Sequence, residues 1–471
     1  MRKSLGLIVN PVAGMGGSVG LKGTDGAMYH KSLELGAEPV TPTRTWDLLT
    51  HIKHKDDISL LVAPGEMGER HIERLGMPIN GAKGVLAASA SRSTSDGYQS
   101  ETSQGKSVLV SDHKTPVFLA GANRGVSEQV QSAIRDAAEA ATDFSWLSRG
   151  DPVFIKPALN SGNPYPDTTS PIAIAAMIEL LREKGAGRVI VGDMSGIEHV
   201  KLSKEGVSGS TRELMEASGM AAAVLMAGGE LYAFEEGGWD GFYEELPVAG
   251  SHWTGGLMMP NILKEVEHII LMPRCARHVL AGTTLGLKAA VGYWRTDTRL
   301  EYHRDASSFQ EKTVEGSTVD TLLKKQRLVV TAADKILATF GPDEGLVYQP
   351  EIGLVIASES VVAHDMISLA WLIENRRAMP PALRESFRDS SRLLASFANR
   401  VVVGLLSDWK TALASETLTK NALDSIWDDR VLNHAYQVFG GRPEIALKVA
   451  NDLVPDDLQK RLSEMSTPSD D

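Results

Sequence analysis

The sequence of 471 residues predicts an α/β protein with parallel or mixed sheet layers and flanking helices. It also predicts a small N-terminal Rossmann-like segment and a C-terminal helical appendage. Two observations support this fold class. From Pro116 onward, short apolar runs alternate with segments of helical period, and strand–helix–strand units of this length are typical of a parallel sheet with right-handed crossovers. The chain is also too long for one ordinary core, so we expect two or three domains.

Composition shifts divide the chain into four regions: 1–87, 88–112, 113–375 and 376–471. The second region is rich in serine and nearly free of apolar residues, so it cannot offset the entropy of ordering and is predicted to be a linker or exposed loop. The last region is predicted to contain helices only, including one at 443–453. A helical end of this kind usually packs on the core or joins subunits, which leaves a homo-oligomer as one expectation.

The alternating segments of the third region follow in order: a strand at 117–120, a helix at 126–141, a strand at 153–157, a helix at 171–184 and a strand at 188–193. Ser170 suits the N-cap of the second helix, and Pro171 suits its first turn. Ligands of open parallel sheets bind past the carboxyl ends of the strands. Lys156 and Asp193 stand at two such ends, so we expect them to bind an anionic substrate.

The overall charge limits the partners of this chain. The formal net charge of −12 argues against general binding to nucleic acid or to an acidic membrane surface. A single cysteine, Cys275, excludes an internal disulfide and a four-cysteine zinc or iron–sulfur site. No apolar run approaches the roughly 18 residues of a membrane span, and the start predicts a first strand instead of a secretory signal. We therefore expect a cytoplasmic protein that binds a small anionic molecule.

A basic stretch follows the next predicted strand, at 268–272. Between Leu271 and Arg304 there are six lysines or arginines but only two acids. Such an excess of positive charge just past a strand end predicts a site for an anion or a polarised oxygen, and Arg274 or Arg277 could hold a carboxylate with two hydrogen bonds. The alternative is a solvated turn with scattered charges.

Glycine-rich loops follow the first predicted strand, at 5–9. Glycines in this position let backbone N–H groups approach a phosphate. The candidate nucleotide-binding residues are Gly14, Gly16, Gly17, Gly23 and Asp25. Together with Pro64–Gly68, these loops resemble the opening of the ATP–NAD kinase family, in its AcoX-like branch. The family's Gly-Gly-Asp-Gly-Thr signature is absent, so we expect a remnant or regulatory nucleotide-binding module and not a kinase.

Further motifs appear in order along the third region, at Asp151–Asn160, Val189–Gly196, Gly341–Gly345 and Ser360–Asp365. Over residues 115–375 the chain resembles the family catalogued as domain of unknown function 362. This resemblance implies a fold but no particular reaction. Many members carry cysteine-rich iron–sulfur segments, and this chain has none, so electron transfer through a cluster is not implied.

The core of the basic stretch has a second resemblance. His278, a small glycine turn, Lys288 ten positions later and a further histidine at His303 are similar to the centre of the nickel-pincer lactate racemase family. The resemblance implies that the lysine carries a covalently attached nickel pincer nucleotide and that the later histidine ligates nickel. The chain departs from the family at Leu285, where glycine is usual. His252 is a candidate, by position only, for the family's second catalytic histidine.

These residue types suit the chemistry that the resemblance implies. Hydrogen on a carbon next to a carboxylate is removed more easily when a cofactor accepts hydride and a histidine takes the hydroxyl proton. We therefore predict His278 and Lys288 as catalytic residues and His303 as a ligand of nickel or another divalent metal. The predicted function is racemase- or epimerase-like chemistry on a small hydroxy-carboxylate.

More ordinary roles remain open for each of these three residues. His278 could bind a backbone carbonyl, Lys288 could pair with an acid or a phosphate, and His303 could lie on the surface. The alternative function is a non-catalytic nucleotide- or anion-binding protein with a degenerate NAD kinase-like module.

Overall fold

The computed structural model describes residues 3–7, 58–62, 114–339, 341–343, 345–379, 392–419 and 423–468. The chain forms two compact units, Met1–Ser111 and Asp112–Asp471. In the first unit, β1 (Lys3–Leu7) pairs in parallel with β2 (Ile58–Val62). Two predictions concern parts of the chain outside the described residues. They are the serine-rich segment and the nucleotide-binding residues Gly14, Gly16, Gly17, Gly23 and Asp25.

An eight-stranded sheet forms the centre of the second unit, in the order β18-β3-β17-β14-β11-β4-β5-β8. Its strands in chain order are β3 (Thr115–Asn123), β4 (Pro152–Pro157), β5 (Arg188–Asp193), β8 (Glu230–Ala233), β11 (His268–Met272), β14 (Gln326–Ala333), β17 (Ile352–Ser358) and β18 (Ile445–Val449). Strand β17 is antiparallel to both of its neighbours, and every other neighbouring pair in this sheet is parallel. The mixed, mostly parallel sheet confirms the predicted fold class.

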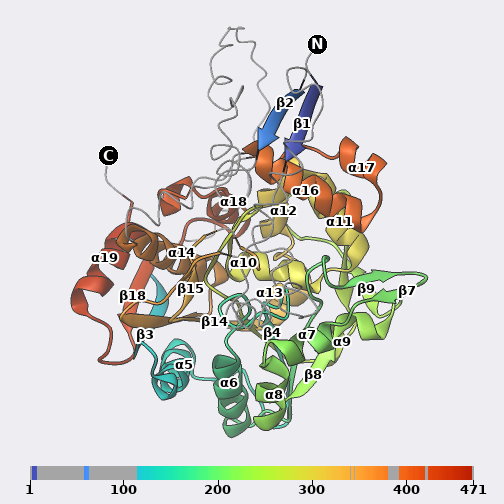
Figure 1. The fold of residues 1–471 in the computed structure, drawn as a ribbon. Coiled ribbons are helices and arrows are strands. Elements are labelled where there is room, and N and C mark those ends of the chain that lie inside the picture. Colours follow the sequence, from blue (N-terminus) through green and yellow to red (C-terminus); the bar gives the residue numbers. More distant parts are fainter. Residues whose placement is uncertain are drawn as a thin grey trace, which may run out of the picture. The chain divides into compact units, whose positions relative to one another are not determined.

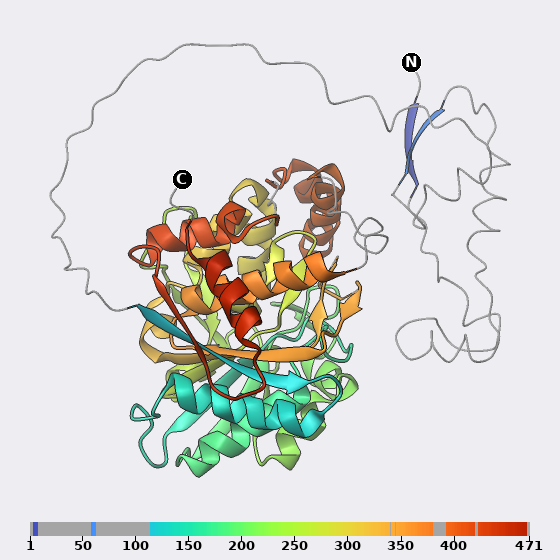
Figure 2. The same cartoon turned by 90° about the vertical axis from the view of Figure 1, so that its left-hand side faces the viewer.

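Helices cover both faces of this sheet (Figures 1 and 2). One face carries α5 (Ser127–Ala141), α6 (Pro171–Glu183), α7 (Thr211–Ala217) and α8 (Met220–Met226). The other carries α14 (Val361–Ala378), α18 (Arg430–Val438) and α19 (Asp456–Ser466). Because side chains alternate along a strand, β3 supplies Val117 and Leu119 to the core on the α14 side and Ala120 and Ala122 to the core on the α5 side.

A third apolar core lies among shorter elements that follow β5. The helices among them are η3 (Phe234–Gly237), α9 (Ile262–Glu265), α10 (Gly286–Ala289), η4 (Ala290–Tyr293), α11 (Thr296–Arg304), η5 (Ala306–Ser308), α12 (Phe309–Glu315) and α13 (Asp320–Lys325). The strands form three small sheets: β6 (Lys201–Ser203) with β7 (Gly206–Ser208), β9 (Phe242–Glu245) with β10 (Leu257–Pro260), and β12 (Ala276–His278), β13 (Gly282–Thr284), β15 (Ile336–Leu337) and β16 (Val347–Tyr348) together.

The C-terminal region is mostly helical, with α16 (Arg392–Leu406), α17 (Trp409–Ala414) and η6 (Ile426–Asp428) preceding α18. The prediction of a helix at 443–453 is wrong, because this segment contains strand β18. This strand pairs in parallel with β3, and Leu447 lies opposite Val117. The open edge of β3 offers a row of backbone hydrogen-bonding groups, and pairing with it overrides the local helical pattern.

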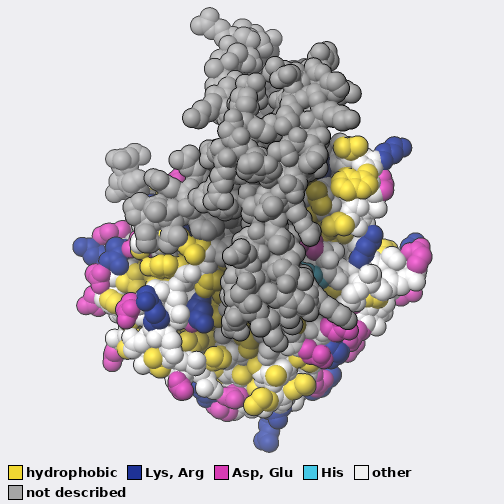
Figure 3. Space-filling model, in the orientation of Figure 1, with side chains coloured by type: hydrophobic (Ala, Val, Ile, Leu, Met, Phe, Trp, Pro, Cys, Tyr) yellow, Lys and Arg dark blue, Asp and Glu magenta, His cyan; other side chains and the backbone are white. Residues whose placement is uncertain are grey.

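Large apolar side chains remain exposed on α16 and α17, where Figure 3 shows them gathered at the upper right. They are Leu393, Phe397, Leu405, Trp409 and Leu413. The homo-oligomer expected from the sequence stays a prediction. In the described parts of the chain, none of the helices has the length and apolarity that crossing a bilayer requires.

Candidate active site

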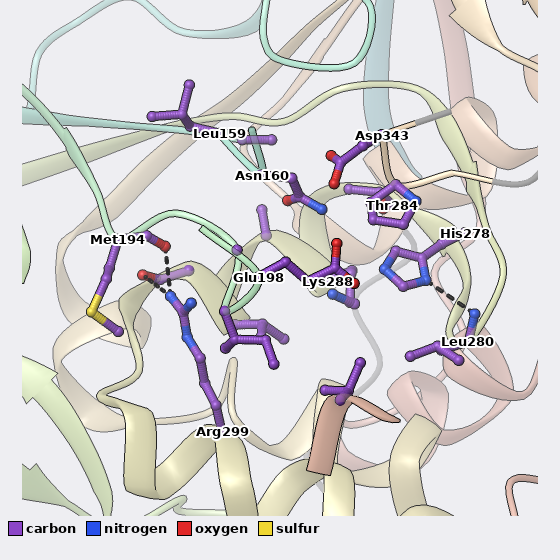
Figure 4. A pocket seen from close by; sticks show the side chains of 18 of the residues that line it. Leu159, Asn160, Met194, Glu198, His278, Leu280, Thr284, Lys288, Arg299 and Asp343 are labelled. Carbon is purple, nitrogen blue, oxygen red and sulfur yellow. Dashed lines mark hydrogen bonds between the residues drawn. The ribbon is translucent and has the colours of Figure 1, made fainter. Parts of the chain in front are cut away.

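A pocket of about 970 Å³, counting the open space at its mouth, lies past the carboxyl ends of β4 and β5. Its walls come from the segments that follow these strands, from the β12–β13 hairpin, from α10 and α11, and from α16 (Figure 4). Five of the residues predicted from the sequence line it together: Lys156, Asp193, His278, Lys288 and His303. Segments that are far apart in the sequence thus meet at the sheet edge where ligands of parallel sheets bind.

Lys156 and Asp193 form a buried ion pair on one side of the pocket. Lys156 Nζ lies 2.9 Å from Asp193 Oδ2, and the two side chains are 1% and 3% exposed. The carboxylate also accepts the backbone N–H groups of Leu159 at 3.1 Å and Met194 at 2.8 Å. A Cβ atom at Gly292 would lie 2.4 Å from both Asp193 Oδ1 and Lys156 Nζ, so glycine is required where the backbone meets this pair.

His278 ends strand β12 and is buried. Its Nδ1 accepts the backbone N–H groups of Leu280 at 3.1 Å and Ala281 at 3.3 Å, so the neutral ring carries its proton on Nε2. Figure 4 shows the other ring nitrogen facing the pocket. Burial, reinforced by the charges of Lys288 and Arg274, holds the pKa of His278 well below its ordinary value. His278 is therefore a neutral hydrogen-bond donor in this geometry, whereas the chemistry predicted from the sequence needs a histidine that accepts a proton.

Lys288 lies on the short helix α10. The first turn of this helix is held by Asp365 of α14, whose carboxylate accepts the backbone N–H groups of Gly286 and Leu287, both at 2.8 Å. Burial, together with the charges of Arg299, Arg274 and Lys156, lowers the pKa of Lys288 to about 7, although the charge of Asp193 opposes this shift. Within the described residues, no acid pairs with the Lys288 amine. A substantial fraction of this amine is uncharged at neutral pH, which makes it available as a nucleophile or base.

His303 lies on α11 and is fixed by Asn399 of α16. Asn399 Nδ2 donates to the backbone oxygen of His303 at 2.7 Å, so the Asn399 Oδ1, 2.8 Å from His303 Nδ1, is the acceptor of that contact. The proton of the neutral ring is therefore on Nδ1, and Nε2 carries the lone pair. Burial lowers the pKa of His303 to about 3 despite the hydrogen bond to Asn399. A neutral imidazole held by a second hydrogen-bonding group is the form that ligates metals.

Arg299 also lines the pocket and was not among the residues predicted from the sequence. Its guanidinium donates to the backbone oxygens of Ser195 and Met194, both at 2.6 Å, and of Gly292 at 3.1 Å. Burial lowers its pKa to about 10, although Asp193 and Glu235 oppose the shift. The available signal was helical spacing, since Arg299 and His303 stand four positions apart and share one face of α11.

Arg274 and Arg277 are buried but are not among the pocket-lining residues. Arg274 donates to the backbone oxygens of Pro166 and Asp167, and Arg277 donates to those of His278 and Gly282. Because buried guanidinium groups need acceptors, these arginines bind the surrounding backbone instead of facing the pocket. Arg274 still influences the pocket, because its charge helps to lower the pKa values of His278 and Lys288.

His252, the positional candidate for a second catalytic histidine, lies outside the pocket lining. Its Nδ1 is 2.6 Å from Glu315 Oε1. The carboxylate of Glu315 accepts the backbone N–H groups of Ser251 and His252 and so holds the loop that carries His252. The role of this residue as a second catalytic histidine stays a prediction.

A family model matches the part of the chain that contributes most of the pocket lining. Residues 153–370 match the family model described as Domain of unknown function (DUF362). The family model begins after the N-terminal unit, so the resemblance of that unit to ATP–NAD kinases stays a prediction. No curated protein matches the chain.

Two solved structures share a distant likeness with this chain. The lactate racemase apoprotein from Thermoanaerobacterium thermosaccharolyticum is 11% identical, with 51% of this chain and 54% of that chain covered and a TM-score of 0.33. A structural-genomics protein from Thermotoga maritima is 12% identical, with 48% and 55% covered and a TM-score of 0.28. The chain thus spans about half the length of each of these structures.

Proposed function

We propose that the pocket is an active site for racemase- or epimerase-like chemistry on a small hydroxy-carboxylate. The observation that carries this proposal is the lowered pKa of the Lys288 amine, about 7. The same pocket also contains two neutral histidines of opposite tautomer. His278 presents an N–H group, and His303 presents a lone pair. A donor, an acceptor and an uncharged amine in one buried pocket favour chemistry over simple anion binding.

Polar groups of the pocket suit a hydroxy-carboxylate ligand. Lys156 and Arg299 contribute buried positive charge, Asp193 is the buried acid beside them, and Glu198 and Asp343 also line the pocket. A substrate carboxylate would be attracted by the two cations, and the Nε2–H of His278 would donate to a substrate oxygen. If His278 took the hydroxyl proton instead, its own proton would have to move to Nδ1, at the cost of both backbone hydrogen bonds.

The side chains that line the pocket also suit a bound cofactor. Lys288 would hold a nickel pincer nucleotide covalently through its uncharged amine, and His303 Nε2 would ligate nickel or another divalent metal. Such a group supplies an acceptor for the hydrogen of the carbon that bears the hydroxyl. Asn399 would keep the His303 ring in the ligating tautomer.

The proposal is tested with the full chain produced together with the enzymes that make the cofactor. Enantiopure small 2-hydroxy acids are incubated with it, and their enantiomeric excess is followed by chiral chromatography. We expect racemisation of at least one acid, together with added mass on the protein and bound nickel. In heavy water, retained carbon-bound hydrogen would indicate a bound hydride acceptor, whereas deuterium incorporation would indicate proton removal by the free Lys288 amine.

A matched variant separates catalysis from binding. Lys288→Met removes the amine but keeps the length and apolar stem of the side chain. We expect it to bind neither the cofactor mass nor nickel and to leave the acids unchanged. If the wild-type chain shows no racemisation, no added mass and no nickel, and small anions still raise its melting temperature, the non-catalytic anion-binding alternative replaces this proposal.

A further inference from the structure

We propose a second metal site, outside the pocket, formed by His252, Glu315 and His434. His252 lies on the loop between β9 and β10, Glu315 ends helix α12, and His434 lies on α18. One potential ligand atom from each of the three lies within 4.8 Å of the others. We call this group the His–Glu–His cluster and infer that it binds a divalent ion of the zinc type.

The donor atoms of the cluster converge on one point. His252 Nδ1 lies 2.6 Å and His434 Nε2 lies 3.0 Å from the same oxygen, Glu315 Oε1. The two rings are nearly perpendicular, at 82°, with their centroids 5.4 Å apart. Two imidazole nitrogens from distant segments thus point at one carboxylate oxygen, which is the approach that a shared ion requires.

The carboxylate is already oriented by the backbone. The N–H of Ser251 donates to Glu315 Oε1 at 3.1 Å, and the N–H of His252 donates to Oε2 at 3.0 Å. Three hydrogen-bond donors therefore surround Oε1, whereas one carboxylate oxygen accepts only about two hydrogen bonds well. A metal ion between the imidazoles and the carboxylate would relieve this crowding, and the backbone donors would remain to orient the ligand.

The local backbone is shaped to bring the loop against Glu315. Gly250 has a φ of +93°, and a Cβ there would lie 2.0 Å from the Glu315 carboxyl carbon. Only glycine permits this approach. The Glu315 side chain is 1% exposed, whereas that of His252 is 37% exposed. The ion would thus be anchored on a buried carboxylate and reached from solvent on the His252 side.

The donor set selects the class of ion. Two imidazole nitrogens and one carboxylate oxygen are typical of zinc and of neighbouring late transition metals, whereas magnesium and calcium prefer sites made of oxygen alone. Three protein ligands leave a fourth tetrahedral position for water. The bound ion would join α12 of the central part to α18 of the C-terminal region and to the β9–β10 loop.

The test measures zinc binding to the full chain, freed of metal with a chelator, near neutral pH. All variants carry His303→Gln, so that a metal in the pocket is not counted. Adding His434→Gln or His252→Gln should remove one bound equivalent of zinc or weaken its binding at least about 100-fold. Zinc should also raise the melting temperature of the parent but not of these variants.

The matched control is His199→Gln. His199 belongs to a second group of potential ligands among the described residues, with Glu198 and Asp343, which contains one imidazole and two exposed members. The control should bind zinc like its parent. Equal stoichiometry and affinity in the parent and in both cluster variants would overturn the proposal. If His434→Gln does not fold without metal, His252→Gln carries the test, because its side chain is the more exposed.

Discussion

Two lysines of the second unit, the buried Lys312 and the half-buried Lys288, have opposite surroundings. Lys312, on α12, is fully buried, and its Nζ lies 2.7 Å from Asp305 Oδ2 and 3.3 Å from Glu301 Oε1. It also lies over the ring of Trp253, 4.8 Å from the centroid. Lys288, on α10, has cations as its main charged neighbours, and no acid in the described residues pairs with it.

The difference shows how charge placement separates a structural lysine from a reactive one. A buried lysine between two carboxylates joins the elements that carry them. A buried cation among other cations loses its proton more easily, and its amine becomes chemically available. The residue type is the same, so the distinction lies entirely in which side chains the fold brings near.

The largest expected effect concerns activity. Lys288→Met should lower racemisation by at least about 1,000-fold, because the uncharged amine is the reactive group, whereas Lys312→Met should change the rate of the folded protein by less than about three-fold. Initial rates measured by chiral chromatography test both variants. Equal losses in the two would remove the proposed distinction between them.

The free energy of unfolding should be lowered more by Lys312→Met than by Lys288→Met, the reverse of the order expected for activity. Lys312→Met leaves Glu301 and Asp305 without their shared cation, and we expect a loss of about 2–3 kcal/mol in the free energy of unfolding. The value is below that of a fully buried pair because both carboxylates are partly exposed. Lys288→Met, which removes a cation from among cations, should cost less than about 1 kcal/mol. Urea denaturation provides the measurement, and a greater loss for Lys288→Met would contradict the comparison.

The pH dependence of stability should show the depressed pKa of Lys288. The folded protein releases this proton near pH 7, whereas the unfolded chain keeps it to about its ordinary value of 10.5. Between these values the unfolded state binds more protons, so stability contributed by this group rises with pH, by at most about 1.4 kcal/mol per unit. Urea midpoints at several pH values should show this rise in the wild type and a smaller one in Lys288→Met. Identical slopes would contradict the shift.

The smallest expected effect concerns Asn399, which positions His303 without facing a substrate. Asn399→Ala should weaken nickel binding about ten-fold, because the ring loses the acceptor that fixes its tautomer. Asn399→Asp keeps an acceptor oxygen and should restore most of the binding. Nickel competition titrations test the series, and equal affinities in the wild type and Asn399→Ala would show that the hydrogen bond does not tune the ligand.

Much of the sheet could be predicted from local patterns. The structure confirms the strands predicted from apolar runs, which are β3, β4, β5 and β11, and the N-cap predicted at Ser170. These signals depend only on neighbours in the sequence. Strand β18 could not be predicted in this way, because its partner β3 lies more than 300 residues earlier in the chain. In this segment, pairing with the open edge of β3 outweighed the local preference for a helix.

The pocket shows the same division between local and long-range information. The sequence by itself determined the alternation of strands and helices from β3 to β5, the excess of basic residues after β11 and the spacing of His278, Lys288 and His303. Only the tertiary structure decided which of these side chains meet, which tautomer each histidine adopts and how far the Lys288 pKa falls. Those properties depend on burial and on contacts between distant residues, such as Asn399 with His303, 96 positions apart, and no local pattern encodes them.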